Sequence, residues 1–182
     1  NECSRKDQGM SFKNIIRYAC TEYEDELKRT IEGLTSQERR FVPNQNSHHV
    51  DFIVWHMARV EDTWINTFGK QGIQIWDEQN WAIHLNLNIY MDEPRSGWGW
   101  DINQVSSMPS FDFEQLCEYL EKVRRCTDKY VESLNDSDMN ICPDEDRPNY
   151  STAQMLAHLV VEQSQHIGQI SYIRGMLRGI DG

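Results

Sequence analysis

STAQMLAHLVVEQSQHIGQISYIRGMLR, residues 151–178, has the pattern of one long helix that buries one side. Ser151 and Gln154 have the spacing of a capping box, which closes the first turn of a helix. Residues that follow at steps of three and four share one side of that helix. They are Met155, Leu159, Glu162, His166, Gln169 and Ile173. The stretch therefore predicts an amphipathic helix that ends near Arg178, before Gly179.

Three further segments show the same helical periodicity of apolar residues. They cover residues 11–34, 47–69 and 112–134. Ser47 is a suitable N-cap for the second helix, and Asp112 with Gln115 forms another capping-box pattern. Because no alternating strand pattern interrupts these segments, the sequence predicts an all-α fold, a four-helix bundle.

Residues 70–109 connect the second helix to the third and are long enough to cross over the bundle. A structureless connection of that length is uncommon, so we expect a short helix in IWDEQNWAIHL, residues 75–85. The connection also contains four tryptophans. They are Trp76, Trp81, Trp98 and Trp100. Such side chains cover an open side of a bundle or, as the second interpretation, form the wall of a ligand pocket.

The composition indicates one acidic domain. The 182 residues include 29 acidic and 18 basic ones, which gives a formal net charge of -11. This charge works against binding to nucleic acid or to an anionic membrane surface, because phosphate contacts need clustered Lys and Arg. We expect a single domain over residues 11–182. Residues 1–10 are interpreted as an N-terminal extension, disordered or added ahead of a native start at Met10.

The five cysteines are scattered and form no C-x-x-C pair. We therefore expect reduced thiols, as in the cytoplasm, rather than a zinc knuckle or a redox motif. The sequence has no apolar run that approaches the length of a membrane span, so neither a membrane anchor nor a secretory signal is expected.

Three polar residues of the last helix are candidate metal ligands. His158, Glu162 and His166 follow one another at steps of four. Eight residues of helix rise about 12 Å, so the two histidines cannot share one ion through bonds of about 2 Å. Residues four apart can converge on one ion. The spacing leaves two pairs open, His158 with Glu162 or Glu162 with His166.

A third ligand must come from another helix, and His56 is the best candidate. It lies beside the apolar side of the second helix, where an unpaired imidazole would be costly. His48 and His49 lie at the start of that helix, and His84 lies in the connection. The structural alternative is that these histidines are boundary residues satisfied by hydrogen bonds. Glu162 among apolar residues favours a metal, because a buried carboxylate needs a cation or a donor.

Charged residues near His56 are interpreted first as surface residues. Arg59 lies on the His56 side of the helix, where we expect a solvated arginine and, second, a partner for a substrate carboxylate. Glu61 and Asp62 lie off that side, and we expect them at a solvated edge or in a salt-bridge surface.

Three stretches of the sequence resemble the DinB-like (YfiT-like) superfamily. HLVVEQSQHIGQISYIRG, residues 158–175, resembles the last helix of its members. WHMARVEDTW, residues 55–64, is similar to their second-helix motif, which contains a metal-binding histidine. IWDEQNWA, residues 75–82, is similar to their connecting segment. The resemblance extends over nearly the whole chain from residue 11 onward and implies a helical bundle with a metal site.

The resemblance implies a site for a divalent metal. Zinc or nickel is expected first, and manganese and iron can also use two imidazoles and a carboxylate. The resemblance selects His56, Glu162 and His166 as ligands and leaves His158 one turn away, in a structural role, beside the ligands or in a pocket. Gln169 is then placed to orient a ligand ring. Many members have histidine at the Glu162 position, but a set of His, Glu and His is similar to that of mycothiol-dependent maleylpyruvate isomerases.

The function that the resemblance implies is thiol chemistry. Characterised branches include bacillithiol and mycothiol transferases and isomerases, so we expect a low-molecular-weight thiol cofactor, a small electrophilic substrate and a homodimer. A second hypothesis is a hydrolase that uses metal-activated water. A third is a non-catalytic bundle whose metal is structural or absent. His158 and Arg59 are weak candidates for catalytic residues in either enzyme.

Overall fold

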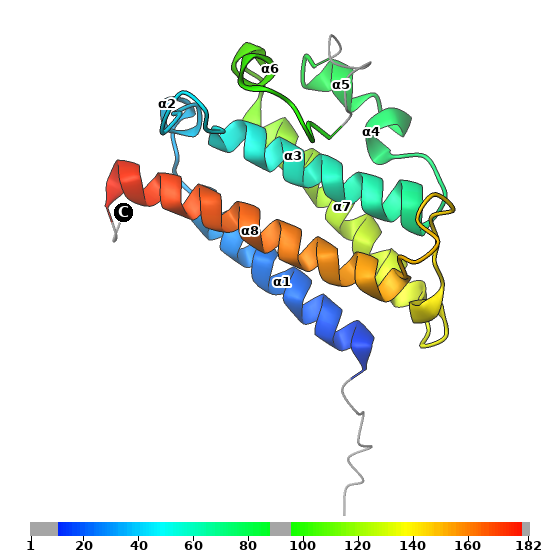
Figure 1. The fold of residues 1–182 in the computed structure, drawn as a ribbon. Coiled ribbons are helices and arrows are strands. Elements are labelled where there is room, and N and C mark those ends of the chain that lie inside the picture. Colours follow the sequence, from blue (N-terminus) through cyan, green and yellow to red (C-terminus); the bar gives the residue numbers. More distant parts are fainter. Residues whose placement is uncertain (1–10, 88–95, 180–182) are drawn as a thin grey trace, which may run out of the picture.

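Four long helices form the bundle in a computed structural model, which describes residues 11–87 and 96–179 (Figure 1). They are α1 (Phe12–Ile31), α3 (Val50–Asp62) with its π-helical continuation η1 (Thr63–Gly69), α7 (Phe113–Ser133) and α8 (Thr152–Arg178). Helix α1 packs against α7 and α8, and α3 packs against the same two helices. The all-α four-helix bundle is therefore confirmed. The extension expected over residues 1–10 lies outside the described residues.

Short helices occupy the connections. They are α2 (Ser36–Arg39), α4 (Ile75–Glu78), α5 (Trp81–His84), α6 (Ile102–Ser107) and the 3-10 helix η3 (Asp138–Asn140). The connection from η1 to α7 contains α4, α5 and α6, so the predicted crossover is confirmed. The single short helix expected over residues 75–85 is instead two, because Asn80 adopts a left-handed backbone with φ of 55° and ends the first.

Helix α8 begins and ends where the sequence predicts. Ser151 and Gln154 form the capping box, and Gly179, with φ of 83°, follows the last residue. The buried side differs by one residue from the predicted one, because Gln163 and Ile167 face the core. Glu162 lies at the edge of that side, with 20% of its side chain exposed. This edge position leaves polar groups of α8 within reach of both α3 and solvent.

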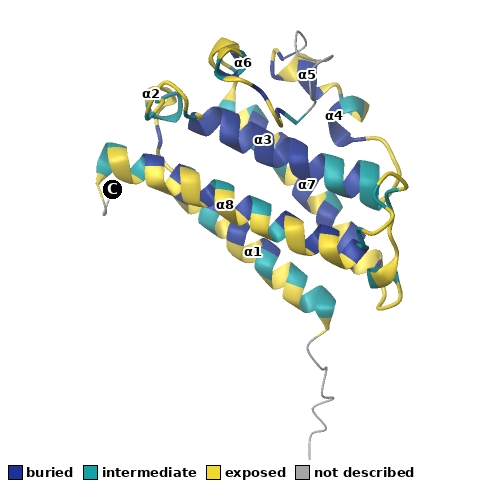
Figure 2. Ribbon diagram, in the orientation of Figure 1, coloured by how far each residue is buried: buried dark blue, intermediate teal, exposed yellow. Residues whose placement is uncertain are grey.

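Helix α3 is buried along its whole length, as Figure 2 shows. Its N-cap is His49 rather than Ser47, because the His49 Nδ1 accepts a hydrogen bond from the Phe52 backbone N–H at 3.0 Å. An N-cap side chain serves the second or third residue of a helix, which Ser47 is too distant to reach. The capping box predicted at Asp112 and Gln115 is also wrong, since Asp112 accepts from the Glu114 N–H.

The expectation that Glu61 and Asp62 form a solvated edge is wrong, because both are fully buried. The Glu61 carboxylate pairs with the Arg124 guanidinium and accepts a hydrogen bond from the Thr127 hydroxyl at 2.6 Å. The face that the helical pattern assigns to solvent is covered by α7. Glu61 therefore belongs to an internal ion pair that ties α3 to α7.

Asp62 joins α3 to the crossover. Its carboxylate accepts the backbone N–H groups of Ile75 and Trp76, the first residues of α4, at 3.0 and 2.9 Å. It also accepts the Tyr119 hydroxyl at 2.7 Å. An acceptor at a helix N-terminus satisfies N–H groups that have no partner within the helix. Asp62 therefore fixes where the crossover leaves the bundle.

Arg59 is fully buried, so its interpretation as a solvated surface arginine is wrong. Its guanidinium donates to the Tyr119 hydroxyl at 3.0 Å, lies 3.5 Å from the Asp62 carboxylate and stacks 4.4 Å from the Trp76 ring.

Within residues 11–87 and 96–179, none of the helices is long and apolar enough to cross a membrane.

Candidate functional site

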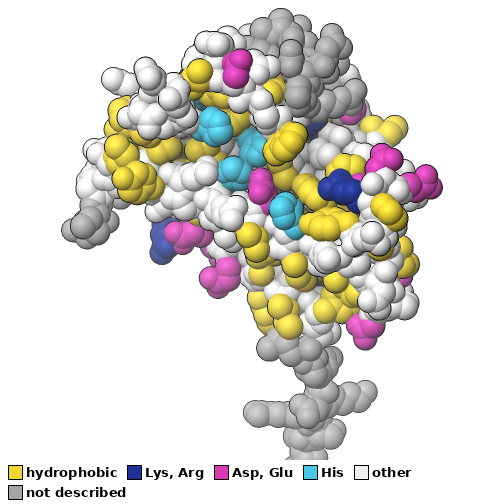
Figure 3. Space-filling view, viewed as in Figure 1, with side chains coloured by type: hydrophobic (Ala, Val, Ile, Leu, Met, Phe, Trp, Pro, Cys, Tyr) yellow, Lys and Arg dark blue, Asp and Glu magenta, His cyan; other side chains and the backbone are white. Residues whose placement is uncertain are grey.

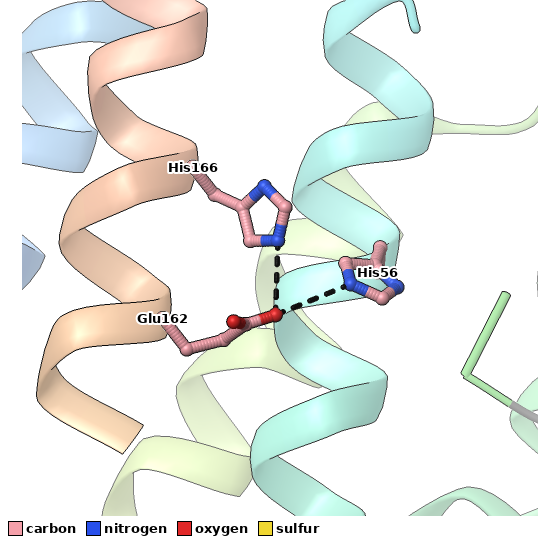
Figure 4. A group of neighbouring side chains, drawn as sticks. All are labelled: His56, Glu162 and His166. Atoms are coloured by element: carbon pink, nitrogen blue, oxygen red, sulfur yellow. Dashed lines mark hydrogen bonds and ion pairs between the residues drawn. The ribbon is translucent and has the colours of Figure 1, made fainter. Parts of the chain in front are cut away.

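Three side chains from two helices face one another across the bundle (Figure 4). His56 comes from α3, and Glu162 and His166 come from α8. The Glu162 Oε1 lies 3.5 Å from the His56 Nε2 and 3.1 Å from the His166 Nε2. One nitrogen or oxygen from each of the three residues lies within 4.8 Å of the others. The arrangement selects the pair Glu162 and His166 from the two that the helical spacing leaves open.

Helix geometry accounts for this cluster. Glu162 and His166 are one turn apart, so their side chains leave α8 on the same side. Helix α3 packs against α8, which brings His56 opposite them. Exposed fractions of the side chains are 8% for His56, 20% for Glu162 and 14% for His166. Figure 3 shows histidine and acidic side chains together on the surface between α3 and α8, so small molecules can reach the cluster.

Each histidine ring is oriented through its Nδ1 atom. The His56 Nδ1 lies 2.5 Å from the Ser96 carbonyl oxygen, and the His166 Nδ1 lies 2.9 Å from the Gln169 Oε1. Because a carbonyl oxygen only accepts hydrogen bonds, each Nδ1 carries the proton and donates. The Nε2 atoms of both rings therefore point at Glu162, where their lone pairs are available to a cation.

The charges in the cluster favour a cation between the three residues. Without an ion between them, the His166 and His56 rings can take a second proton on Nε2, and the hydrogen bonds that they then donate hold the pKa of the Glu162 carboxyl well below its usual range. Burial lowers the pKa of His166, but hydrogen bonds to Glu162 and Gln169 outweigh it, so the pKa lies above its ordinary value. The lone pairs of the two neutral Nε2 atoms and the Glu162 carboxylate converge on one position. A proton or a metal ion at that position balances the negative charge of the carboxylate.

The three residues fit a divalent metal ion. Ligand atoms around a tetrahedral ion with bonds of about 2.0–2.2 Å lie about 3.3–3.6 Å apart. Before any adjustment of the side chains, the separations of 3.5 and 3.1 Å from Glu162 are close to this value, and all three ligand atoms lie within 4.8 Å of one another. Two imidazoles and one carboxylate are a ligand set suited to zinc and nickel. The ordering of both rings through Nδ1 also matches what metal-binding histidines require.

Comparison with protein families identifies the chain. A family model described as mycothiol-S-transferase matches residues 16–179. The chain belongs to the mycothiol-S-transferase family. This match confirms the resemblance to DinB-like proteins noted in the sequence.

Solved structures support the fold of this mycothiol-S-transferase family member. A conserved protein from Enterococcus faecalis, known from a crystal structure, is similar with a TM-score of 0.82 and 18% identity. The similarity covers 94% of this chain and 99% of that one. At this identity the likeness shows the fold alone. The search of curated proteins finds no match.

Gln169 and His158 differ in their relation to the cluster. Gln169 contacts the ring of His166, the position expected of a residue that orients a ligand. The exposed His158 lies one turn before Glu162, and its ring packs 5.2 Å from Trp64 and 6.5 Å from Tyr150. His158 therefore stands beside the cluster without belonging to it.

The four tryptophans divide into two groups. Trp76, Trp81 and Trp100 are buried and belong to the hydrophobic core, which agrees with the first interpretation, that of cover. Trp98 is 77% exposed, so it neither covers the bundle nor packs in the core. Among the described residues, a different set of side chains lines the pocket next to the candidate site.

A pocket of about 350 Å³ lies next to Gln169. Its described lining consists of neutral side chains. They come from Pro43, Asn44, Asn46, Ser47, His48, Ile53, Gln169, Tyr172 and Ile173. Gln169 also contacts His166, so the pocket and the cluster share this neighbouring side chain, although none of the three candidate ligands lines the pocket. The segment before α3 therefore supplies most of the polar groups, a role that its sequence does not indicate.

Sequence reasoning missed Ser96, whose carbonyl holds His56. A backbone carbonyl leaves no mark in side-chain type or spacing. The one available signal is the next residue, since Gly97 has a left-handed backbone with φ of 78° and is buried against Trp55. A glycine required for backbone geometry indicates that the crossover passes close to α3 at this point.

Proposed function

We propose that this protein is a metal-dependent enzyme that joins a low-molecular-weight thiol to a small electrophile, or isomerises such a substrate with the thiol. The observation that carries the proposal is the convergence of the His56 Nε2, the His166 Nε2 and the Glu162 Oε1 beside a solvent-accessible pocket. Membership in the mycothiol-S-transferase family supports the choice of thiol chemistry, with mycothiol as the first thiol to test.

Three protein ligands leave a tetrahedral ion one open position, as in catalytic rather than structural sites. A divalent cation, zinc or nickel first, would favour the thiolate form of a thiol bound there, and the thiolate is the nucleophile. Ser96 and Gln169 keep both rings turned toward that position. The neutral pocket beside Gln169 would hold the body of the thiol or of the electrophile by hydrogen bonds and apolar contacts.

Metal content tests the ligand set. Elemental analysis of purified protein should find about one equivalent of a divalent metal, as expected for a three-ligand site. His56→Ala, Glu162→Ala and His166→Ala should each lose the metal while far-UV circular dichroism stays unchanged. Wild-type protein that takes up no metal after reconstitution would contradict the proposal. Loss of helicity in the Glu162→Ala variant would instead indicate a structural ion.

Enzyme assays test whether the reaction depends on a thiol. Metal-loaded protein should accelerate conjugation of monochlorobimane with mycothiol or bacillithiol, and the three ligand variants should not. Turnover of an ester or amide without any added thiol would instead favour the metal-dependent hydrolase. The homodimer and the cytoplasmic location remain predictions, and sedimentation velocity tests the first of them.

A further inference from the structure

A groove whose charged lining residues are mostly basic lies between α7 and the segment from η1 to α4. Its volume is about 620 Å³. The charged residues of its described lining are one acidic and four basic side chains. They are Glu78, Lys70, Lys122, Arg125 and Lys129. In a chain with a formal net charge of -11, this local excess of positive charge marks a surface suited to an anion.

The sequence explains why the cations gather there. Lys122, Arg125, Cys126 and Lys129 recur on α7 at steps of three and four, so they share one face of the helix. Lys70 follows directly after η1 and approaches that face from α3. Two elements far apart in sequence thus contribute to one groove.

Cys126 lies at the wall of this groove, in contact with Lys70. The Lys70 Nζ is 3.2 Å from the Cys126 Sγ and 3.0 Å from the Asn66 Oδ1, to which the thiol donates at 3.0 Å. The Asn66 side chain is held in turn by its bond to Asp62 at 2.8 Å. Asn66 lies in a π-helical segment, a feature frequent at functional sites. The Lys70 ammonium group therefore lies next to the sulfur, where it attracts an anionic ligand towards Cys126.

Existing ion pairs leave the groove available to an anionic ligand. Lys122 pairs with Glu118 and Arg125 pairs with Glu121, each at 3.0 Å along α7. Such exposed pairs within a helix are weak, because water screens them. An anionic ligand can therefore recruit both cations at small cost.

Cys126 is half-buried, and the other described cysteines lack its combination of partial access and neighbouring positive charge. Cys20 is 3% exposed. Burial raises the pKa of Cys117 to about 11, so little thiolate forms near neutral pH. Cys142 is exposed but is followed closely by Asp144 and Glu145 in the sequence. Cys126 is therefore the described thiol best placed to react with an anionic partner.

We propose that this groove binds the anionic disulfide of a low-molecular-weight thiol and that Cys126 is thiolated there. The Cys126 thiol gives its proton to solvent, and the thiolate attacks one sulfur of the bound disulfide. A new disulfide bond forms between Cys126 and that sulfur as the original bond breaks. The other half leaves as a thiolate and takes a proton from water. The proposal is independent of the metal site and of the proposed function.

Disulfides of opposite charge test the proposal on the intact protein. At low ionic strength, oxidised glutathione, which is anionic, should add to Cys126 faster than to Cys142. Cystamine, which is cationic, should show the reverse order. Peptide mapping by mass spectrometry follows each cysteine separately. Equal rates at Cys126 and Cys142 with oxidised glutathione, or a faster reaction of cystamine than of oxidised glutathione at Cys126, would overturn the proposal.

Variants that each remove one positive charge provide a second test of the proposal. Lys70→Gln and Lys129→Gln should each slow addition of oxidised glutathione to Cys126 by about fivefold, the effect of one unit charge about 4 Å away in water. Lys28→Gln removes the same charge from an exposed position on α1 and should leave the rate unchanged. Lys129 is exposed and its replacement leaves the contact of Lys70 with Cys126 in place, so unchanged rates in both groove variants would contradict the proposal.

Discussion

The Ser96 carbonyl oxygen accepts a hydrogen bond from the His56 Nδ1 at 2.5 Å, which links the crossover to the candidate metal site. This contact depends on Gly97, the next residue. A Cβ added to Gly97 would lie 2.6 Å from the Trp55 ring, well inside van der Waals contact. The crossover therefore approaches α3 closely at this point because residue 97 has no side chain.

Replacing Gly97 by alanine should weaken both the fold and the metal site. The clash with Trp55 and the left-handed backbone together should lower the free energy of unfolding by about 2–4 kcal/mol. Displacement of the Ser96 carbonyl should lower metal affinity about tenfold, as for other partners of ligand histidines. Urea denaturation and metal titration measure the two effects.

Gly99→Ala is the matched control for this substitution. Gly99 has nearly the same φ, 80°, but an added Cβ would meet no atom within 4 Å. The control should lower the free energy of unfolding by about 1 kcal/mol and leave metal affinity unchanged. Equal losses of metal affinity in the two variants would show that backbone strain alone, and not the approach to Trp55, governs the site.

Gln169→Ala should lower metal affinity by about tenfold to a hundredfold with little change in stability. The reason is that the Gln169 Oε1 holds the His166 ring, while the residue itself is exposed. Competition with a fluorescent chelator measures the affinity. Gln165→Ala, also exposed and one residue before His166, should bind metal like the wild type. Wild-type affinity in the Gln169 variant would mean that packing alone orients the ring.

The part of the site on α8 can be predicted from the sequence, because helix geometry is regular. Glu162 and His166 are four residues apart, and this spacing alone puts them on one side of the helix. Choosing His166 over His158 required knowing where α3 crosses α8. That depends on packing between helices, which the spacing within one helix does not encode. The resemblance to DinB-like proteins supplied the choice, and the geometry agrees with it.

The charged residues of α3 show where pattern reasoning fails. The helical pattern predicts a solvated face for Arg59, Glu61 and Asp62, because an amphipathic helix usually has such a face. Here α7, α8 and the crossover together cover α3. The charges are retained inside because each finds a partner from another element, as Glu61 does in Arg124. Glu61 and Arg124 lie 63 residues apart in sequence, so their pairing has no local signature.

Arg124→Leu should lower the free energy of unfolding by about 3–5 kcal/mol, because it leaves the fully buried Glu61 without its cation. The double variant Glu61→Leu with Arg124→Leu should be less destabilised than this single variant, since no unpaired charge remains. Arg125→Leu, at the neighbouring exposed position, should change stability by less than about 0.5 kcal/mol. Additive effects in the double variant would contradict an internal ion pair.

The free energy of unfolding should decrease as the pH falls below 6.5, because of His49. Burial, followed by the positive charge of Arg40, lowers the pKa of His49 in the folded protein to about 4. The unfolded chain therefore binds a proton at higher pH than the folded protein does, so stability is fully present above the unfolded pKa and is lost as the pH falls. The loss should reach about 3 kcal/mol near pH 4.

Variants at two histidines isolate this effect in urea denaturation at pH 7 and pH 4.5 with a chelator present. His49→Asn keeps an acceptor for the Phe52 N–H, because asparagine is a good N-cap, but cannot take up the proton. It should therefore lose less stability than the wild type between the two pH values. His84→Asn alters an exposed histidine and should behave like the wild type. If His49→Asn shows the full wild-type loss, the acid sensitivity arises elsewhere, and the buried cap of α3 does not contribute to it.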